Sequence, residues 1–302
     1  MKTDEASSTA YTVAQGIVYS GRYSPDREHV PVQLLESSEI ILESSSDGRK
    51  LLRQLRNPAV RLLLKLFERL TLPGMSFHYV LRKTYIEYSV RQAIASGVKQ
   101  VIILGAGFDM LAYMLSKEFK EVEFLEIDHP ATSKDKQNAL DPQVIERPNL
   151  HFSAVDFSQQ SLSEALSSNS NFDSGLSSVF VCEGVLMYLS ENDVSNLLVS
   201  IRESAVGDCR FVFTSLEPLQ SPQNDCGLIL RLYLRAKSES LAWFCPQSSI
   251  SLVLEKHGLR MDESANDGQI ASQLMPNLRR KRFHKGEYVV NASKQESQNN
   301  LS

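Results

Sequence analysis

A turn with two glycines follows a short apolar segment in the first half of the chain. In VIILGAGFDM, residues 101–110, Gly105 and Gly107 come directly after four aliphatic residues. A glycine turn after the first strand of an α/β sheet lets the backbone approach a bound nucleotide closely. We therefore expect a nucleotide-type cofactor here, although a tight connection between a strand and a helix would produce the same pattern.

The residues after this turn indicate which nucleotide it holds. A dinucleotide fingerprint needs a third glycine, and Met110 occupies that position. A phosphate-binding loop needs Lys followed by Ser or Thr at the start of the helix, and Asp109 stands there instead. Its carboxylate would repel a phosphate but accept a ligand with an ammonium or sulfonium group. These features favour S-adenosylmethionine over NAD.

Acidic residues follow the next three apolar segments of the chain. Glu126 and Asp128 end the second segment, and the alternation of a strand puts both on one face, where they could bind ribose hydroxyls. Asp156, with Phe157 beside it, ends the third and suits the amine and the ring of adenine. Glu183 ends the fourth. One such acid is ordinarily a solvated loop residue, but acids at successive strand ends indicate a nucleoside pocket.

Strands alternate with helices in the part of the chain that must position these residues. We expect strands at 101–104, 122–127, 150–155, 178–182 and 210–215, and helices near 109–118, 131–139, 160–167 and 191–205. This order predicts a parallel sheet with right-handed crossovers. Further helices are expected between about 32 and 70, including one at 57–70, and at 80–96, 227–244 and 248–258. Further strands are expected at 258–263 and 287–293.

The same patterns predict one domain with loose ends. Residues 1–12 and 294–302 are small or polar and have little to bury, so we expect them to be loose. The single domain is expected to span 13–293, with a helical lid at 13–96, the cofactor-binding core at 97–216, and substrate-side helices with the last strands at 217–293.

Composition limits the classes of partner. The chain has 302 residues and a net charge of −4, which gives no general attraction to nucleic acid or to anionic lipid. It lacks an apolar run of about 18 residues, which a membrane span needs, and its first residues resemble neither a signal nor a transit peptide. We therefore expect a cytoplasmic protein without a nucleic-acid or membrane partner.

Two other groups of residues are interpreted without a function. The cysteines Cys182, Cys209, Cys226 and Cys245 have no CxxC spacing and no matching histidines, so we expect reduced thiols and no metal. The basic run at 279–282 is interpreted as a solvated loop before the last strand.

Four segments carry a resemblance to a known family. They are LRKTYIEYSV at 81–90, VIILGAGFDMLAYML at 101–115, EIDHP at 126–130 and CEGVLMYLSENDVSNLL at 182–198. In these the chain resembles, from about residue 30 to 292, the leucine carboxyl methyltransferase family. This family belongs to the class I S-adenosylmethionine-dependent methyltransferases and includes bacterial O-methyltransferases that act on polyketide-type molecules. The resemblance implies a Rossmann-like fold: a mostly parallel seven-stranded sheet with helices on both faces, a helical N-terminal lid, and a helical insertion before the last strands.

The resemblance also assigns roles to single residues. It implies that Gly105 lies against the cofactor, that Asp128 and Glu126 hold the ribose, that Asp156 and Phe157 recognise adenine, that Arg82 pairs with the cofactor's carboxylate, and that Glu183 lies near its methionine portion. Lys83 follows Arg82 where many relatives have Thr, so Lys83 is the alternative partner of the carboxylate. Glu183 and Tyr188 are expected to position the reactants.

The function expected on these grounds is S-adenosylmethionine-dependent O-methyl transfer to a carboxylate or hydroxyl of a small molecule. A carboxylate acceptor is already ionised near pH 7 and needs no general base, whereas a hydroxyl would need one. One alternative acceptor is the C-terminal leucine carboxylate of a protein. An alternative of another class is a non-catalytic protein that binds S-adenosylmethionine, because fold alone does not imply function. The acidic balance of the chain disfavours an RNA-modifying enzyme.

Overall fold

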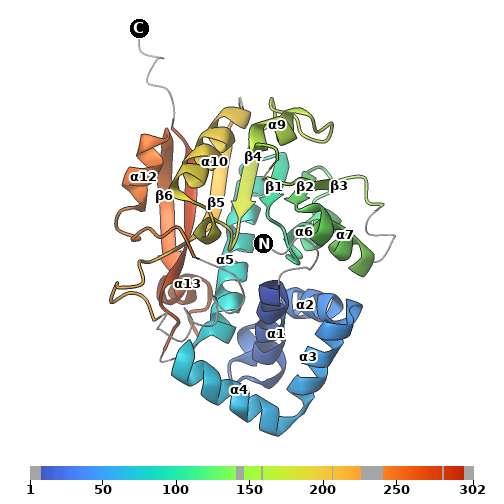
Figure 1. Ribbon diagram of the computed structural model, residues 1–302, viewed down its shortest axis with the longest axis vertical. Helices are drawn as coiled ribbons and strands as arrows, with labels where there is room; N and C mark the ends of the chain where they lie inside the picture. The colour runs from blue at the N-terminus through green and yellow to red at the C-terminus, as the bar shows by residue number, and fades with distance from the viewer. Residues whose placement is uncertain are drawn as a thin grey trace.

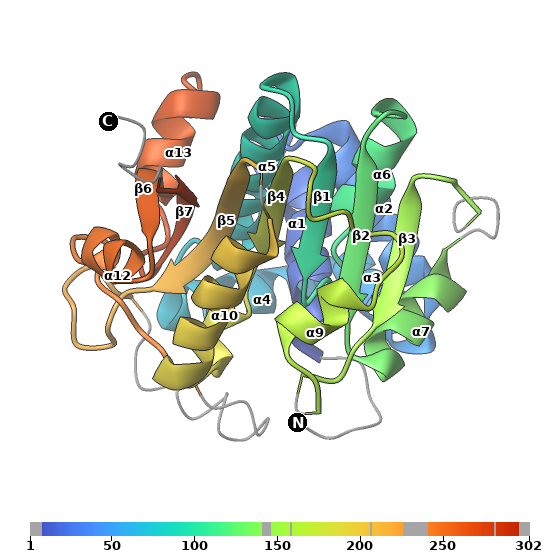
Figure 2. The same ribbon diagram turned by 90° about the horizontal axis from the view of Figure 1, so that it is seen from above.

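Seven strands form one sheet in the order β3-β2-β1-β4-β5-β7-β6 (Figures 1 and 2). The computed structural model describes residues 8–140, 146–157, 159–205, 207–225, 241–280 and 282–295. Strand β7 is antiparallel to both its neighbours, and the pairs among β1 to β5 are parallel. The strands are β1 Gln100–Leu104, β2 Glu123–Asp128, β3 Leu150–Ala154, β4 Ser178–Cys182, β5 Cys209–Leu216, β6 Leu259–Asn266 and β7 Glu287–Lys294. The expected mostly parallel, seven-stranded sheet is confirmed.

Helices cover the sheet and also build a separate group at one end of the molecule. That group comprises α1 Ser8–Tyr23, α2 Val32–Ser44, α3 Ser46–Arg56 and α4 Pro58–Thr71 (Figure 1). The other helices are α5 Met75–Ala95, α6 Leu111–Glu118, α7 Pro130–Ala139, α9 Leu162–Ser167, α10 Glu191–Ser204, α12 Ile250–Lys256 and α13 Asp267–Leu274, with short 3-10 helices η1 Arg27–His29 and η2 Leu186–Tyr188.

Two apolar clusters form, one on each face of the sheet, because successive strand residues point to opposite faces. In β1, Val101 and Ile103 join a cluster that includes side chains of α5, α6 and α13. Ile102 and Leu104 join the other cluster, with side chains of α9, α10 and α12. Figure 2 shows α9, α10 and α12 together on one side of the sheet. The first cluster also contains residues of α1, α2 and α3, so these helices share a core with the sheet.

The structure corrects three expectations. Helix α1 begins at Ser8, so residues 8–12 are helical rather than loose, and the Tyr11 ring packs against Phe108 with 4.8 Å between centroids. The expected helix at 227–244 lies mostly outside the described residues, but its last four residues are not helical. There the N–H groups of Ala242 and Trp243 donate to the Met187 carbonyl, so the chain is bonded to η2 instead of to itself.

The third correction concerns the basic run. Arg280 does not lie in a solvated loop: its Nη1 donates to Asp26 at 2.8 Å, and its guanidinium lies over the Phe77 ring, 4.9 Å from the centroid. Arg279 and Arg282 are exposed as expected. The segment before β7 is therefore tied to the helical group through Arg280.

Candidate active site

The carboxyl ends of the parallel strands bring the predicted residues to one edge of the sheet. Leu104 pairs with Ile127, so the Gly105 turn and Asp128 lie side by side. One carboxylate oxygen of Asp128 accepts a hydrogen bond from the Gly107 N–H, and the other accepts from His129 N–H at 2.6 Å. Asp128 therefore holds the glycine turn in place.

Glycine is needed in this turn for two reasons. Gly105 and Gly107 have φ values of +64° and +51°, where other residues are strained. A Cβ on Gly105 would also lie 2.6 Å from Val185 Cγ2, which is closer than two carbons can approach. Gly184, after β4, has φ +68°, and no atom of the described residues lies within 4 Å of its Cβ position.

Helix α5 supplies two cations to the same edge, the buried Arg82 and the partly buried Lys83, which together are the cation pair of this site. Arg82 Nε donates to Glu183 Oε1 at 2.8 Å, and Arg82 Nη1 donates to Glu287 Oε2 at 2.7 Å. Lys83 Nζ lies 3.0 Å from Glu183 Oε2 and 3.2 Å from Asp109 Oδ2. Both candidates for binding the cofactor's carboxylate thus meet at Glu183.

Opposite charges keep Glu287, Asp109 and Arg82 ionised around neutral pH. Burial would raise the pKa of Glu287, but Arg82 and His78 hold it well below its usual range. Burial would likewise raise the pKa of Asp109, but Lys83 lowers it. Burial would lower the pKa of Arg82, and the Glu287 and Glu183 carboxylates raise it instead.

Sequence reasoning missed the groups behind Arg82. The two ring nitrogens of His78 lie 2.7 Å from Asp267 Oδ1 and 2.8 Å from Glu287 Oε2, and all three residues are buried. Glu287 begins β7, which enters the sheet antiparallel, so the start of β7 lies beside the end of β5. An acid at the head of an apolar strand is the signal in the sequence, but only the strand order shows which edge it reaches.

Glu126 faces helix α7. Its Oε2 is 2.6 Å from Lys136 Nζ, and Lys136 also donates to the Asp109 carbonyl. Burial raises the pKa of Glu126 to about 7, against the effect of Lys136. Glu126 Oε1 is buried and has no hydrogen-bond partner among the described residues. Its role toward ribose stays a prediction.

The remaining predicted residues lie around this edge. The Val155 N–H donates to the Asp128 carbonyl at 2.8 Å, which places Asp156 next to the end of β2. Phe157 is exposed beside it, and Tyr188 lies half-buried in η2, after Glu183. The structure therefore gathers the predicted adenine-binding pair and the predicted positioning residues near the same strand ends.

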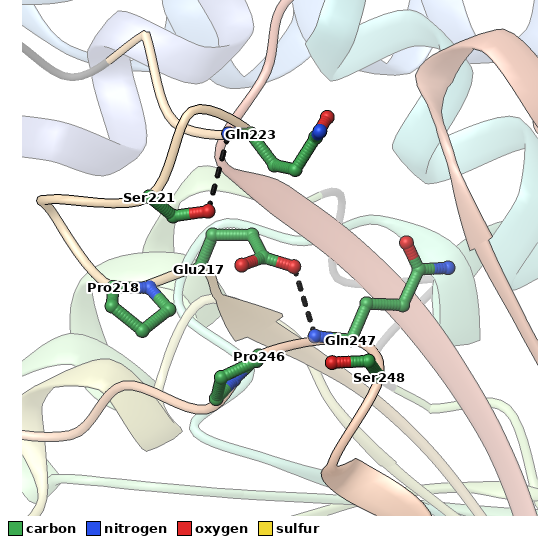
Figure 3. A pocket seen from close by; sticks show the side chains of 7 residues that line it. All are labelled: Glu217, Pro218, Ser221, Gln223, Pro246, Gln247 and Ser248. Carbon is green, nitrogen blue, oxygen red and sulfur yellow. Dashed lines mark hydrogen bonds between the residues drawn. The ribbon is translucent and has the colours of Figure 1, made fainter.

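A surface pocket opens beyond the end of β5 (Figure 3). It has a volume of about 440 Å³ and is lined by Glu217, Pro218, Ser221, Gln223, Pro246, Gln247 and Ser248. The Glu217 carboxylate accepts a hydrogen bond from Gln247 N–H at 2.8 Å. Leu216 pairs with Glu287, so this pocket belongs to the same edge of the sheet as the cation pair. Glu217 is a fifth acid at a strand end, and sequence reasoning missed it.

The described segments contain no group of three or more His, Cys, Asp or Glu arranged to hold a metal. Cys182, Cys209 and Cys245 are buried free thiols, and Cys226 lies outside the described residues. None of the helices in these segments has the length and apolarity that a bilayer crossing requires.

Several known proteins are similar to this chain. A protein of Streptomyces coelicolor, named "Putative S-adenosyl-L-methionine-dependent methyltransferase", is 31% identical over 145 residues, which are 47% of this chain and 49% of the relative. A Bacillus subtilis protein of the same description is 26% identical over 170 residues, 53% of this chain and 55% of its own. The similarity thus spans about half the length of these curated relatives.

The fold has a counterpart among solved structures. A "putative methyltransferase" from Thermobifida fusca superimposes with a TM-score of 0.56 over 91% of this chain and 100% of its own, at 13% identity. The sequence profile described as leucine carboxyl methyltransferase matches residues 44–202, which include the cation pair, the glycine turn and Glu183. The chain belongs to the leucine carboxyl methyltransferase family.

Proposed function

We propose that the protein is an S-adenosylmethionine-dependent O-methyltransferase whose acceptor is a carboxylate or hydroxyl of a small molecule. The observation that carries the proposal is the convergence of the glycine turn, Asp128, Glu183, Arg82 and Lys83 at one edge of the sheet. In open α/β sheets, ligands bind outside the carboxyl ends of the strands, which is this edge. The curated relatives, described as methyltransferases that depend on the same cofactor, support the proposal.

The charges at this edge fit the amino-acid end of the cofactor, which carries a carboxylate and an ammonium group. Arg82 or Lys83 would hold the carboxylate, and Glu183 or Asp109 the ammonium. These side chains now pair with one another. A zwitterion inserted between them would replace one ion pair by two and leave no buried charge unpaired. Thr84 Oγ1, in the next position along α5, is buried without a partner among the described residues.

The nucleoside end fits the strand ends beside the glycine turn. Asp128 accepts two backbone hydrogen bonds, and a carboxylate has about four acceptor positions, so it can also accept from ribose hydroxyls. Around the turn, the acids Asp109, Asp128 and Glu183 outnumber the two cations of α5. An excess of acid favours a sulfonium ligand and disfavours the pyrophosphate of a dinucleotide.

When bound, S-adenosylmethionine would supply an electrophilic methyl group on sulfur. The protein's own work would be to align an acceptor oxygen with that group and to exclude water. His129 has a structural role, because its Nδ1 accepts the Ala131 N–H at 3.3 Å and caps α7. This geometry suits an acceptor that is already ionised. The pocket beside Glu217 lies on the same edge and is our candidate for part of the acceptor side.

The proposal predicts binding of the cofactor and of S-adenosylhomocysteine. Each should raise the melting temperature, because a ligand that binds only the native state stabilises it. Asp128→Asn and Glu183→Gln should each weaken binding about tenfold or more, corresponding to about 1.4 kcal/mol. Glu203→Gln, an exposed substitution on α10, is the matched control and should bind normally. Calorimetric titration of folded wild-type protein that detects neither ligand would contradict the proposal.

The acceptor is tested with methyl-labelled cofactor and a cell extract separated into small molecules and polypeptides. Base-labile label in the small-molecule fraction indicates a methyl ester, and base-stable label there indicates an ether. Label on a polypeptide would favour the alternative that the family's description suggests, a protein's C-terminal leucine carboxylate. Cofactor binding without any label transfer would favour a non-catalytic binding protein.

A further inference from the structure

Helix α4 carries its large apolar side chains on the outside of the molecule. Leu62, Leu63, Leu66, Phe67 and Leu70 are 68, 65, 52, 58 and 70% exposed. No residue of α4 is buried, and none belongs to the apolar cores that α1, α2 and α3 join. A surface helix ordinarily turns its apolar stripe toward the core. Here the stripe faces away from it.

Polar contacts on the inner side fix this orientation. Arg61 Nη1 donates to the Leu55 carbonyl at 2.8 Å, and its guanidinium lies 4.3 Å from the centroid of the Tyr23 ring. About two turns further along the same face of the helix, Glu68 accepts a hydrogen bond from Ser76 Oγ at 2.5 Å. Arg61 and Glu68 are seven residues apart and share one face. The helix is therefore held with its polar face inward and its leucines outward.

The surrounding charge is strongly basic. Helices α3 and α4, residues 46–71, contain seven Arg and Lys residues and two acids, although the whole chain has a net charge of −4. Most of these cations are exposed, including Lys65 and Arg69 beside the apolar stripe of α4. The net charge of −4 is therefore the sum of +5 in residues 46–71 and −9 in the rest of the chain.

We propose that helices α3 and α4 dock on the surface of an anionic lipid bilayer, with α4 lying in the interface. An amphipathic helix with Leu and Phe on one side and Lys and Arg beside them binds in this way, and each cation near an anionic leaflet adds attraction. The expectation of no membrane partner rested on the lack of a membrane-spanning apolar run and on the net charge of the whole chain, and neither describes a helix that lies on the surface of a bilayer. Figure 1 shows α4 at the outer end of the molecule, so a bilayer that contacts α4 would not contact the sheet.

The same charges disfavour a second copy of the chain as the occupant. A two-fold interface presents the same patch from both subunits. Two antiparallel α4 helices would therefore bring Lys65 and Arg69 of one copy toward the same residues of the other, and the α3 cations would add to the repulsion. An anionic surface neutralises these charges, which is why we assign the bilayer as the occupant.

The test is co-sedimentation with vesicles, which does not depend on methyl transfer. Wild-type protein should partition onto phosphatidylcholine vesicles that contain phosphatidylglycerol, and should partition far less onto phosphatidylcholine alone. Leu66→Asp, and separately the pair Lys65→Glu with Arg69→Glu, should lower the partition coefficient about tenfold or more. Leu252→Asp is the matched control, because Leu252 is 59% exposed on α12, outside helices α3 and α4. This variant should bind vesicles like the wild type.

Folding of each variant is checked by circular dichroism and melting temperature, which substitutions at exposed positions should leave nearly unchanged. Failure of folded wild-type protein to bind the anionic vesicles overturns the proposal, as does an unchanged partition of Leu66→Asp. A dimer that Leu66→Asp dissociates, without vesicle binding, would assign the face to a second copy. Binding to an acidic peptide, but not to vesicles, would assign it to a protein partner.

Discussion

His78 connects two buried carboxylates, Asp267 and Glu287, and Glu287 also pairs with Arg82. Both ring nitrogens face carboxylate oxygens, which only accept hydrogen bonds, so both nitrogens must carry a proton. Burial alone would lower the pKa of His78, but Asp267 and Glu287 raise it to about 9. A protonated His78 fixes Glu287, and Glu287 in turn fixes one end of the Arg82 guanidinium. His78 is therefore a positioning residue for the cation pair.

This arrangement predicts a loss of stability as the pH rises. The folded pKa of His78, about 9, lies above the ordinary value of 6.5. The stabilisation is therefore complete below about pH 6.5 and is lost as the pH rises through 9. Between pH 7 and 8.5 the free energy of unfolding should fall by about 1 kcal/mol per pH unit. Urea denaturation across this range measures the slope.

Two other buried groups have shifted pKa values and contribute differently. Burial raises the pKa of Glu126 to about 7 from its ordinary value of 4.5, so Glu126 removes stability as the pH rises from about 4.5 through 7, and its effect fades in the lower part of this window. The buried ring of His284 contacts His78, with 5.0 Å between centroids, and its pKa is lowered to about 4. His284→Gln should therefore keep the alkaline slope, while His78→Gln should flatten it. A wild-type stability that does not change between pH 7 and 8.5 would refute the assignment.

The residues of the site differ in how far the sequence could predict them. Gly105 and Glu183 each directly follow an apolar strand, Asp128 is the last residue of one, and parallel strands must place such residues at one edge. Arg82 came only from the family resemblance, because an Arg on a helix is ordinarily solvated. His78 and Glu287 are 209 positions apart in the sequence, and nothing local indicates that they touch.

At the scale of elements, the β1 turn and the β4 turn differ in one respect that can be measured. Gly105 and Gly184 have nearly the same backbone, with φ values of +64° and +68°. Alanine at either position should cost about 1–2 kcal/mol in backbone strain. Only at Gly105 does the new methyl collide, with Val185 Cγ2, and a β-branched side chain cannot rotate away easily.

We expect the free energy of unfolding of Gly105→Ala to be about 1–3 kcal/mol lower than that of Gly184→Ala. Denaturant unfolding of both variants measures the difference, since the strain common to both cancels. Adding Val185→Ala to Gly105→Ala should recover part of the loss. Equal stability of the two glycine variants would show that the turn relaxes around the new methyl.

Periodicity predicted most elements, and its failures have identifiable causes. The apolar spacing of α4 correctly indicated a helix, but spacing does not say whether the apolar face meets a core or solvent. Polar anchors at Arg61 and Glu68 decided that, through contacts with other elements. Helix α13 went unpredicted because it is only eight residues long and contains Gly268, although Asn266 caps its start. Residues 241–244 are not helical because backbone N–H groups in this segment donate to η2.

At the scale of the whole molecule, the sheet separates two large apolar clusters. One joins side chains of α1, α2, α3 and α5 to those of the strands, and α5 carries the cation pair. The other lies between the sheet and helices α9, α10 and α12, on the opposite face. Charge is divided as well, because helices α3 and α4 carry a net charge of +5 and the rest of the chain carries −9. The N-terminal helices are thus joined to the sheet by packing but differ from the rest of the chain in charge.

The second cluster contains three cysteines that can report on its cooperativity. Cys182 lies in β4, Cys209 in β5 and Cys245 in the segment before α12, and all belong to this cluster. Burial raises the pKa of Cys209 to about 12 and that of Cys245 to about 11, and it also raises that of Cys182. A buried thiol with a high pKa reacts only when the structure opens, since the thiolate is the nucleophile.

In a Cys226→Ser background, we therefore expect all three thiols to resist a disulfide reagent and to react in a single phase. Their common opening free energy should match that of global unfolding, because one packed cluster opens as one unit. Mass spectrometry of partly labelled protein should find molecules with none or three labels and few with one. Early labelling of Cys245 alone would show that its segment, bonded through its carbonyl to Tyr288 at 2.8 Å, opens independently of the strands.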